Sequence, residues 1–220
     1  MKVFISAGHG GSDPGAVANG VKEKDLNLSI ALACRDELKR HGVEVKMSRT
    51  KDENDPLSEE IRECNAFSPD LAVSIHNNAG GGDGAEVFHH HGGGKGKTLA
   101  ENILAEIVKV GQNSRGAKVR KNSQGKDYYG FIRETSAPAV IVECAFVDNA
   151  SDLKILATES DRQKVGRAIA IGVLKTLGVE IQGERRYYKV QVGAYLYRES
   201  AEAMQKKIKA VGFDAFIVKE

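Results

Sequence analysis

The sequence lacks the features that mark several specialised classes of protein. Its 220 residues include no tryptophan, four prolines and only three cysteines, Cys34, Cys64 and Cys144. An odd number of widely spaced cysteines fits neither a disulfide framework nor a Cys-x-x-Cys metal site, so we expect all three to be buried apolar residues. No apolar run approaches the ~20 residues of a membrane helix, so we expect no membrane insertion.

The sequence also lacks a large excess of charge and an export signal. The formal net charge is +2, and nucleic-acid-binding proteins usually carry dense basic patches, so we expect no nucleic-acid partner. The start, MKVFISAGHG, has neither an apolar segment long enough for a signal peptide nor a small-residue cleavage site after one. We therefore expect synthesis in the cytoplasm without a signal peptide.

Apolar runs typical of strands alternate with helical patterns over residues 1–178. The expected strands are KVFIS, VEVKM, LAVSI, AEVF, YGFI and AVIVECAF. Helices are expected from a cap at Asp25 to Gly42, from Leu99 to Gly111 and from Val165 to Gly178, where apolar residues recur at helical spacing. This alternation predicts an α/β fold with a mainly parallel central sheet and helices on both faces.

The pattern changes after Gly178. Residues 179–186 are typical of a short polar linker, and residues 187–220 predict a strand, a helix capped by Ser200 and a second strand. We therefore expect a first domain over residues 1–178 and a small C-terminal βαβ module over residues 187–220. So short a unit rarely holds a core alone, so the module should pack against something else.

Three ionisable residues are expected at one edge of the sheet, where parallel strands present functional groups. His9 follows KVFIS, His76 follows LAVSI, and Glu143 lies near the end of AVIVE. Glu23, at the entrance to the first helix, should point toward the same strand ends. Two histidines and a carboxylate are an expected ligand set for a catalytic zinc ion, which predicts Zn²⁺ bound by His9, Glu23 and His76.

Glu143 is a single carboxylate in an apolar strand, and an unpaired buried carboxylate is costly. A general base beside a metal-activated water accounts for it. Apolar surroundings raise the pKa of such a carboxyl toward neutrality, while zinc lowers the pKa of the water to about 7.

Each of these residues also has a simpler interpretation. A histidine after a strand is often a hydrogen-bonded structural group, and Glu23 lies in a charged string typical of a solvated helix start. The glycine runs at 8–15 and 92–98 lack the order of a P-loop or a dinucleotide-binding turn. The run His89, His90 and His91 is typical of an exposed loop start; adventitious metal binding and a grip on glycan are the alternatives.

Residues 1–176 resemble the zinc-dependent N-acetylmuramoyl-L-alanine amidases of the amidase 3 family, the cell-wall hydrolases of bacteria and phage endolysins. The resemblance rests on motifs in the family's order: GHGGSDPGA, KEKDLNLSIA, VEVKMSRTKD, SIHNNA, GAEVF and SAPAVIVECAFVDNASD. It implies that His9, Glu23 and His76 bind zinc and that Glu143 is the catalytic acid/base. The substrate it implies is peptidoglycan, cut between N-acetylmuramic acid and the L-alanine of the stem peptide.

The sequence departs from the family's pattern at two places. Ser6 and Ala7 stand where the family usually has Asp-Pro, which implies a lost contact behind the ligands. Glu60 stands where an arginine is common, and Cys64-Asn65 replaces an Ala-Asn pair, which implies a rearranged salt bridge.

The tail resembles one half of a SPOR module, the repeat that binds peptidoglycan strands stripped of stem peptides. YYKVQVGAY, the following helix and FDAFIVKE match one βαβ half. A complete SPOR sheet needs two halves, so we expect a homodimer in which two tails form one four-stranded sheet. A tail docked on its own catalytic domain is the alternative.

Two other functions stay open beside the amidase: a non-catalytic adaptor that binds cell wall, and a zinc peptidase that acts within the stem peptide. The expected site of action is the cell wall, reached after lysis or release. The enzyme would then be a phage endolysin or a sporulation autolysin.

Overall fold

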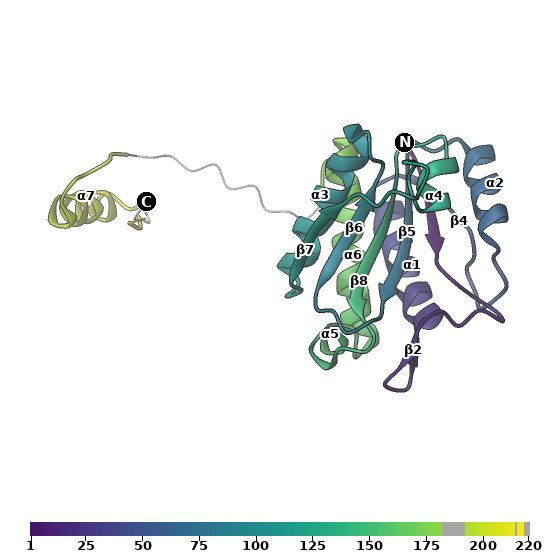
Figure 1. The fold of residues 1–220 in the computed structure, drawn as a ribbon. Coiled ribbons are helices and arrows are strands. Elements are labelled where there is room, and N and C mark those ends of the chain that lie inside the picture. Colours follow the sequence, from purple (N-terminus) through teal and green to yellow (C-terminus); the bar gives the residue numbers. More distant parts are fainter. Residues whose placement is uncertain (182–191, 214, 218–220) are drawn as a thin grey trace. The chain divides into compact units, whose positions relative to one another are not determined.

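The computed structural model describes residues 1–181, 192–213 and 215–217. Contacts within the chain divide it into two compact units, Met1–Gln182 and Gly183–Glu220. The first unit contains the central sheet and Figure 1 shows its helices packed around that sheet. All three cysteines are free and buried, as predicted.

The first unit is built on a six-stranded sheet with the order β4-β1-β5-β8-β6-β7. Neighbouring strands are parallel from β4 to β8, whereas β6 is antiparallel to β8 and parallel to β7. The sheet strands are β1 (Lys2–Ala7), β4 (Glu44–Met47), β5 (Leu71–Asn78), β6 (Ala85–His89), β7 (Ser114–Lys118) and β8 (Ala139–Phe146). A separate two-stranded ribbon pairs β2 (Val17–Ala18) with β3 (Val21–Lys22).

Helices cover both faces of this sheet (Figure 1). The larger core packs the sheet against three long helices, α1 (Glu23–Arg40), α3 (Gly94–Lys109) and α6 (Glu159–Leu177). On the other face a smaller core joins the sheet to α2 (Leu57–Phe67) and α4 (Gly130–Glu134). The short α5 (Ala150–Ile155) follows β8. The mainly parallel α/β fold predicted from the sequence is therefore confirmed.

One predicted strand is wrong, and one strand of the sheet was not predicted. The run YGFI was expected as a strand, but Gly130 begins α4, which buries Phe131 and Ile132 in the smaller core. Four apolar residues are too few to separate a strand from a buried helical turn by periodicity. Strand β7, in contrast, has the polar sequence SRGAK and carries no apolar alternation to predict it.

Helix ends differ slightly from the expected ones. Helix α1 begins at Glu23 after Lys22, so Asp25 lies in its first turn and is not its cap. Helix α6 begins six residues before Val165, at a capping box formed by Thr158 and Asp161, and ends at Gly178 in the left-handed conformation, as expected. These shifts leave the helix faces unchanged.

In the second unit the structure describes one helix, α7 (Arg198–Ala210), which is not capped by Ser200, since its N-cap is Tyr197. The first predicted strand falls mostly on residues outside the described ones. Residues 192–197, 213 and 215–217 carry no strand. The βαβ arrangement of the tail therefore stays a prediction. Among the described helices, none is long and apolar enough to span a bilayer.

The contact of α1 with α6 depends on Gly166. A Cβ atom at Gly166 would lie 2.4 Å from the carbonyl oxygen of Ile30 and 2.7 Å from the Ala33 Cβ. We predict that Gly166→Ala lowers the free energy of unfolding by about 2 kcal/mol, because overpacking outweighs the gain of ~1 kcal/mol from higher helix propensity. Denaturant unfolding measures this, with the exposed neighbour Arg167→Ala as control. Greater stability of Gly166→Ala would contradict this close packing.

Candidate active site

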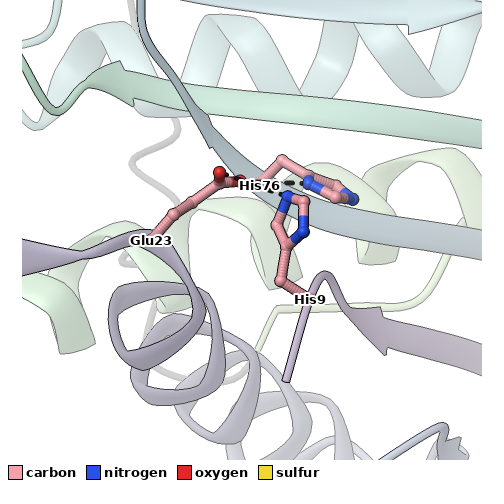
Figure 2. Close-up of side chains that lie close together, drawn as sticks. All are labelled: His9, Glu23 and His76. Atoms are coloured by element: carbon pink, nitrogen blue, oxygen red, sulfur yellow. Dashed lines mark hydrogen bonds and ion pairs between the residues drawn. The ribbon is translucent and has the colours of Figure 1, made fainter. Parts of the chain in front are cut away.

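The structure brings together the three residues predicted to bind metal. His9 lies two residues beyond β1, Glu23 is the first residue of α1, and His76 lies near the end of β5. One donor atom from each residue lies within 4.8 Å of the other two. Figure 2 shows both imidazoles meeting the Glu23 carboxylate. Because β1 and β5 are parallel neighbours, their carboxyl ends deliver both histidines to the same edge of the sheet.

The Glu23 carboxylate lies between the two imidazoles. Its Oε2 is 3.2 Å from His9 Nε2, and its Oε1 is 3.1 Å from His76 Nδ1. Burial disfavours ionisation of Glu23, but the hydrogen bonds to His76 and His9 outweigh burial and lower its pKa. The same contact raises the pKa of His9 to about 9. Two imidazole nitrogens and an ionised carboxylate therefore lie close enough together to bind one metal ion.

Backbone groups hold this carboxylate in place. The amide of Ala16 donates to Glu23 Oε2 at 2.9 Å, and the amide of Asn77 donates to Oε1 at 3.1 Å. The Asn27 side chain adds a third donor at 3.1 Å. The Glu23 carboxylate is therefore held by segments that lie far apart in the sequence. A carboxylate at a solvated helix start would have no such contacts.

Each histidine has a partner on its other ring nitrogen. His9 Nδ1 lies 2.8 Å from Asp13 Oδ2, and His76 Nε2 lies 3.1 Å from Ser74 Oγ. Such partners fix the ring orientation and the tautomer of metal-binding histidines. Sequence reasoning did not single out Asp13 or Ser74. The spacing of four between His9 and Asp13 within the GHGGSDPGA motif was the available signal.

Two glycines allow the close approach of these side chains. A Cβ atom at Gly8 would lie 2.1 Å from His76 Cε1, and one at Gly15 would lie 2.6 Å from both Glu23 Oε2 and His9 Cδ2. Any side chain at either position would collide with a proposed ligand. The glycines after β1 are therefore required by packing at the site.

Arg49 holds the loop that carries His9, and sequence reasoning missed it. Its guanidinium is buried and donates to the carbonyl oxygens of Ala7 at 2.7 Å, Lys24 at 2.8 Å and Gly8 at 3.3 Å. It thus ties the end of β1 to the start of α1. The residue lies within VEVKMSRTKD, but only the tertiary structure shows what it binds.

The two departures from the family pattern lie in contact. Ser6 Oγ donates to Glu60 Oε2 at 2.9 Å, and Ser74 Oγ donates to Ser6 Oγ at 3.3 Å. Burial, with the charge of Asp55, raises the pKa of Glu60 to about 7. A continuous chain of hydrogen bonds therefore runs from His76 through two hydroxyls to a carboxyl. The contact expected to be lost at Ser6 is replaced by this chain.

Glu143 lies beside His76 in the sheet but makes no hydrogen bond with the cluster. The two residues are register partners in β5 and β8. Glu143 Oε2 is buried with no hydrogen-bond partner among the described residues. Burial raises the pKa of Glu143 to about 7, with His76 opposing the rise and the charges of Glu23 and Glu86 adding to it. A partly protonated carboxyl therefore adjoins the three clustered residues at neutral pH.

The histidine run after β6 is divided. His89 is buried at the end of the strand, whereas the side chains of His90 and His91 are 50% and 37% exposed. The expected exposed loop start therefore holds for the last two histidines only.

Comparison with known proteins decides the family. The family model described as N-acetylmuramoyl-L-alanine amidase (Amidase_3) matches residues 3–175. The chain belongs to this family. A model of the SPOR domain matches residues 141–219, of which the first part, up to Leu177, contains most of β8 together with α5 and α6 of the first unit. The amidase match contains all four predicted site residues.

Individual relatives agree with the family match. The chain is 36% identical over 223 residues to the N-acetylmuramoyl-L-alanine amidase CwlM of Bacillus licheniformis, with 99% of this chain and 85% of that protein covered. It is 35% identical to the sporulation-specific N-acetylmuramoyl-L-alanine amidase of Bacillus subtilis, with 99% and 84% covered.

A solved structure gives the same result. The catalytic domain of the amidase CwlV of Bacillus (Paenibacillus) polymyxa is 29% identical, with a TM-score of 0.73 and with 81% of this chain and 99% of that chain covered. The protein is therefore a peptidoglycan hydrolase that cleaves the amide bond between N-acetylmuramic acid and L-alanine.

The raised pKa of Glu143 predicts a pH-dependent cost to stability. Ionisation of Glu143 costs more in the folded state than in the unfolded state, so stability is lost as pH rises from about 4.5 through about 7. We predict that Glu143→Gln in metal-free protein matches the wild type near pH 4.5 and exceeds its free energy of unfolding above pH 8, by on the order of 3 kcal/mol. Denaturant unfolding across pH measures this difference.

The exposed Glu44→Gln serves as the control and should change stability equally little at both pH values. A constant difference between Glu143→Gln and wild type across the whole range would show that Glu143 ionises as freely as a solvated carboxyl.

Proposed function

We propose that the amidase depends on zinc, that His9, Glu23 and His76 hold the ion, and that Glu143 is the general acid/base. The donor set supports the zinc assignment, because two imidazole nitrogens and one carboxylate are typical ligands of a catalytic zinc ion. Bound there, zinc would polarise the scissile carbonyl and lower the pKa of a water molecule to about 7. The orientation of each histidine by Asp13 or Ser74 fits the same role.

The observation that carries the acid/base assignment is the buried Glu143 Oε2 beside His76, which accepts no hydrogen bond from any described residue. A carboxyl with a pKa of about 7 is ionised often enough at neutral pH to accept a proton from water. The same carboxyl then donates that proton to the departing amine of L-alanine. No covalent intermediate is needed, because a single group moves the proton in both directions.

A zinc peptidase acting within the stem peptide would use the same residues. The family match favours the amidase, and the product distinguishes the two activities. An amidase releases intact stem peptides from the sugar, whereas a peptidase releases fragments, so mass analysis of digested walls decides. A non-catalytic adaptor is not favoured, because all four residues expected to carry the chemistry are in place.

Substitutions should separate the acid/base from the proposed ligands. We predict that Glu143→Gln keeps the zinc content of the wild type but lowers kcat on defined muropeptides by about 10²- to 10⁴-fold, the usual size of an acid/base contribution. His76→Ala should lose both zinc and turnover, and a chelator should abolish wild-type cleavage. Metal analysis and single-turnover assays measure these effects, with Glu44→Gln as control. Native turnover by Glu143→Gln would rule out the assignment.

We also propose that two tails pair into one SPOR sheet, which would make the enzyme a homodimer. In the second unit α7 has no buried residue. The segments that precede and follow this helix in the sequence expose large apolar side chains. These are Val192, Tyr195, Leu196, Tyr197, Val211, Phe213, Phe216 and Ile217. A second half-module would cover such surface and complete a sheet that one half cannot form. The SPOR match supports peptidoglycan as its ligand.

Sedimentation tests this pairing. We predict that the intact chain sediments as a dimer, with twice the mass of its single 23.7 kDa chain, and that a version ending at Gly183 sediments as a monomer. Monomers for both proteins would contradict the pairing, and dimers for both would place the interface outside the tail.

We propose that the enzyme acts on the cell wall after lysis or release, as an autolysin of sporulation and not as a phage endolysin. The support is that the sporulation-specific relative aligns over 99% of this chain, tail included.

A further inference from the structure

Two histidines in the turn after β6 converge on a buried aspartate. His90 Nε2 lies 3.1 Å and His91 Nδ1 lies 2.7 Å from Asp127 Oδ2. One donor atom from each of the three residues lies within 4.8 Å of the other two. The Asp127 side chain is only 4% exposed, while both imidazoles reach solvent. The cluster is thus a carboxylate at the base of two accessible nitrogen donors.

The backbone fixes Asp127 independently of the two imidazoles. Its Oδ1 accepts a hydrogen bond from the backbone amide of His91 at 2.9 Å, which turns Oδ2 toward both rings. The Arg133 guanidinium donates to the Asp127 carbonyl oxygen at 2.8 Å, and an isolated antiparallel bridge pairs Asp127 with Lys121. A donor set ordered in this way loses little further freedom when it binds an ion.

This cluster is separate from the catalytic site. His89, at the end of β6, is the register partner of Val140 near the beginning of β8. Glu143, further along β8, is the partner of His76 in the catalytic site. The two groups of residues therefore adjoin different parts of the same strand and share no side chain.

We propose that His90, His91 and Asp127 form a second binding site for a divalent transition-metal ion such as Zn²⁺. Imidazole nitrogen favours Zn²⁺, Co²⁺, Ni²⁺ or Cu²⁺ over Mg²⁺ and Ca²⁺, which prefer oxygen ligands. Three protein ligands leave room for water on the exposed side. The proposal does not depend on zinc at the catalytic site.

When both rings are neutral, metal binding here requires each of them to change tautomer. The Gly92 amide donates to His90 Nδ1 at 3.0 Å, so in a neutral ring Nε2 carries the proton that points at Asp127. When Nε2 binds an ion, that proton moves to Nδ1 and the Gly92 amide loses its acceptor. The cost is small because Gly92 is exposed and water can accept the bond instead. His91 changes in the opposite sense, with its Nε2 gaining the proton.

The bound ion would join two segments that follow different strands. His90 and His91 follow β6, whereas Asp127 lies in the loop between β7 and α4. The same loop continues to Tyr129, whose ring centroid lies 4.9 Å from that of Phe88 in β6. An ion at the cluster would therefore fasten this loop to β6 and should stabilise the fold.

Zinc titration of the full-length chain tests the proposal. The variants are Asp127→Asn, which keeps both histidines and the Oδ1 acceptor, and His90→Gln/His91→Gln. His89→Gln, which alters a tract histidine outside the cluster, is the control. Calorimetry and metal analysis after gel filtration give the number of ions per chain, and thermal unfolding with and without zinc gives the stabilisation.

Asp127→Asn and the double variant should each bind one zinc ion fewer than the wild type and show a smaller zinc-induced rise in Tm, while His89→Gln should match the wild type. If Asp127→Asn binds as many ions as the wild type with equal affinity, the histidine tract binds metal adventitiously and the proposal is wrong. If Asp127→Asn does not fold, the double variant keeps the proposal falsifiable, because retention of every bound ion without the imidazoles of His90 and His91 would overturn it. If the proposed catalytic site binds no zinc, the number of zinc ions per wild-type chain falls by one. The difference in bound ions between the wild type and the variants stays the same.

Discussion

The proposed active site depends on one carboxylate, that of Glu23, which contacts two imidazoles. Glu23 can meet His9 and His76 at 3.2 Å and 3.1 Å only because β1 and β5 are parallel neighbours and α1 begins at their carboxyl ends. Glycines at positions 8 and 15 remove the side chains that would otherwise collide with these groups. The contact of Glu23 with His9 and His76 therefore requires the strand order of the sheet, the turn after β1 and the position of the first residue of α1 together.

The carboxyl groups in and around this cluster differ in pKa because their surroundings differ. Glu23 is paired and hydrogen-bonded, so it is ionised despite burial. One buried oxygen of Glu143 has no hydrogen-bond partner in the part of the chain that the structure describes, and the pKa of this carboxyl is raised to about 7. Glu60, behind His76, has a similarly raised pKa but is linked to the imidazole through Ser6 and Ser74. The hydrogen-bond donors around each carboxyl, and not the residue type, thus separate the proposed metal ligand Glu23 from the proposed proton carrier Glu143.

The fold and the cluster of His9, Glu23 and His76 were largely predictable from the sequence. The ends of the strands and the order of the motifs can be recognised from short stretches of residues. His9, Glu23 and His76 meet as expected. The groups that hold them were not predicted, since Arg49 and the Ser6–Glu60 contact act across segments that only the tertiary structure brings together. The prediction of a strand at YGFI was wrong for a related reason. Burial against α2 decides the conformation of this run, and its short apolar pattern does not.

Anomalous diffraction at the zinc absorption edge, from crystals of the zinc-loaded enzyme, tests the central claim most directly. The account predicts a peak at the point faced by the imidazoles of His9 and His76 and the carboxylate of Glu23, with Glu143 beside it and outside bonding distance. An active enzyme with no peak at that point, or with Glu143 among the ligands in place of Glu23, would contradict it.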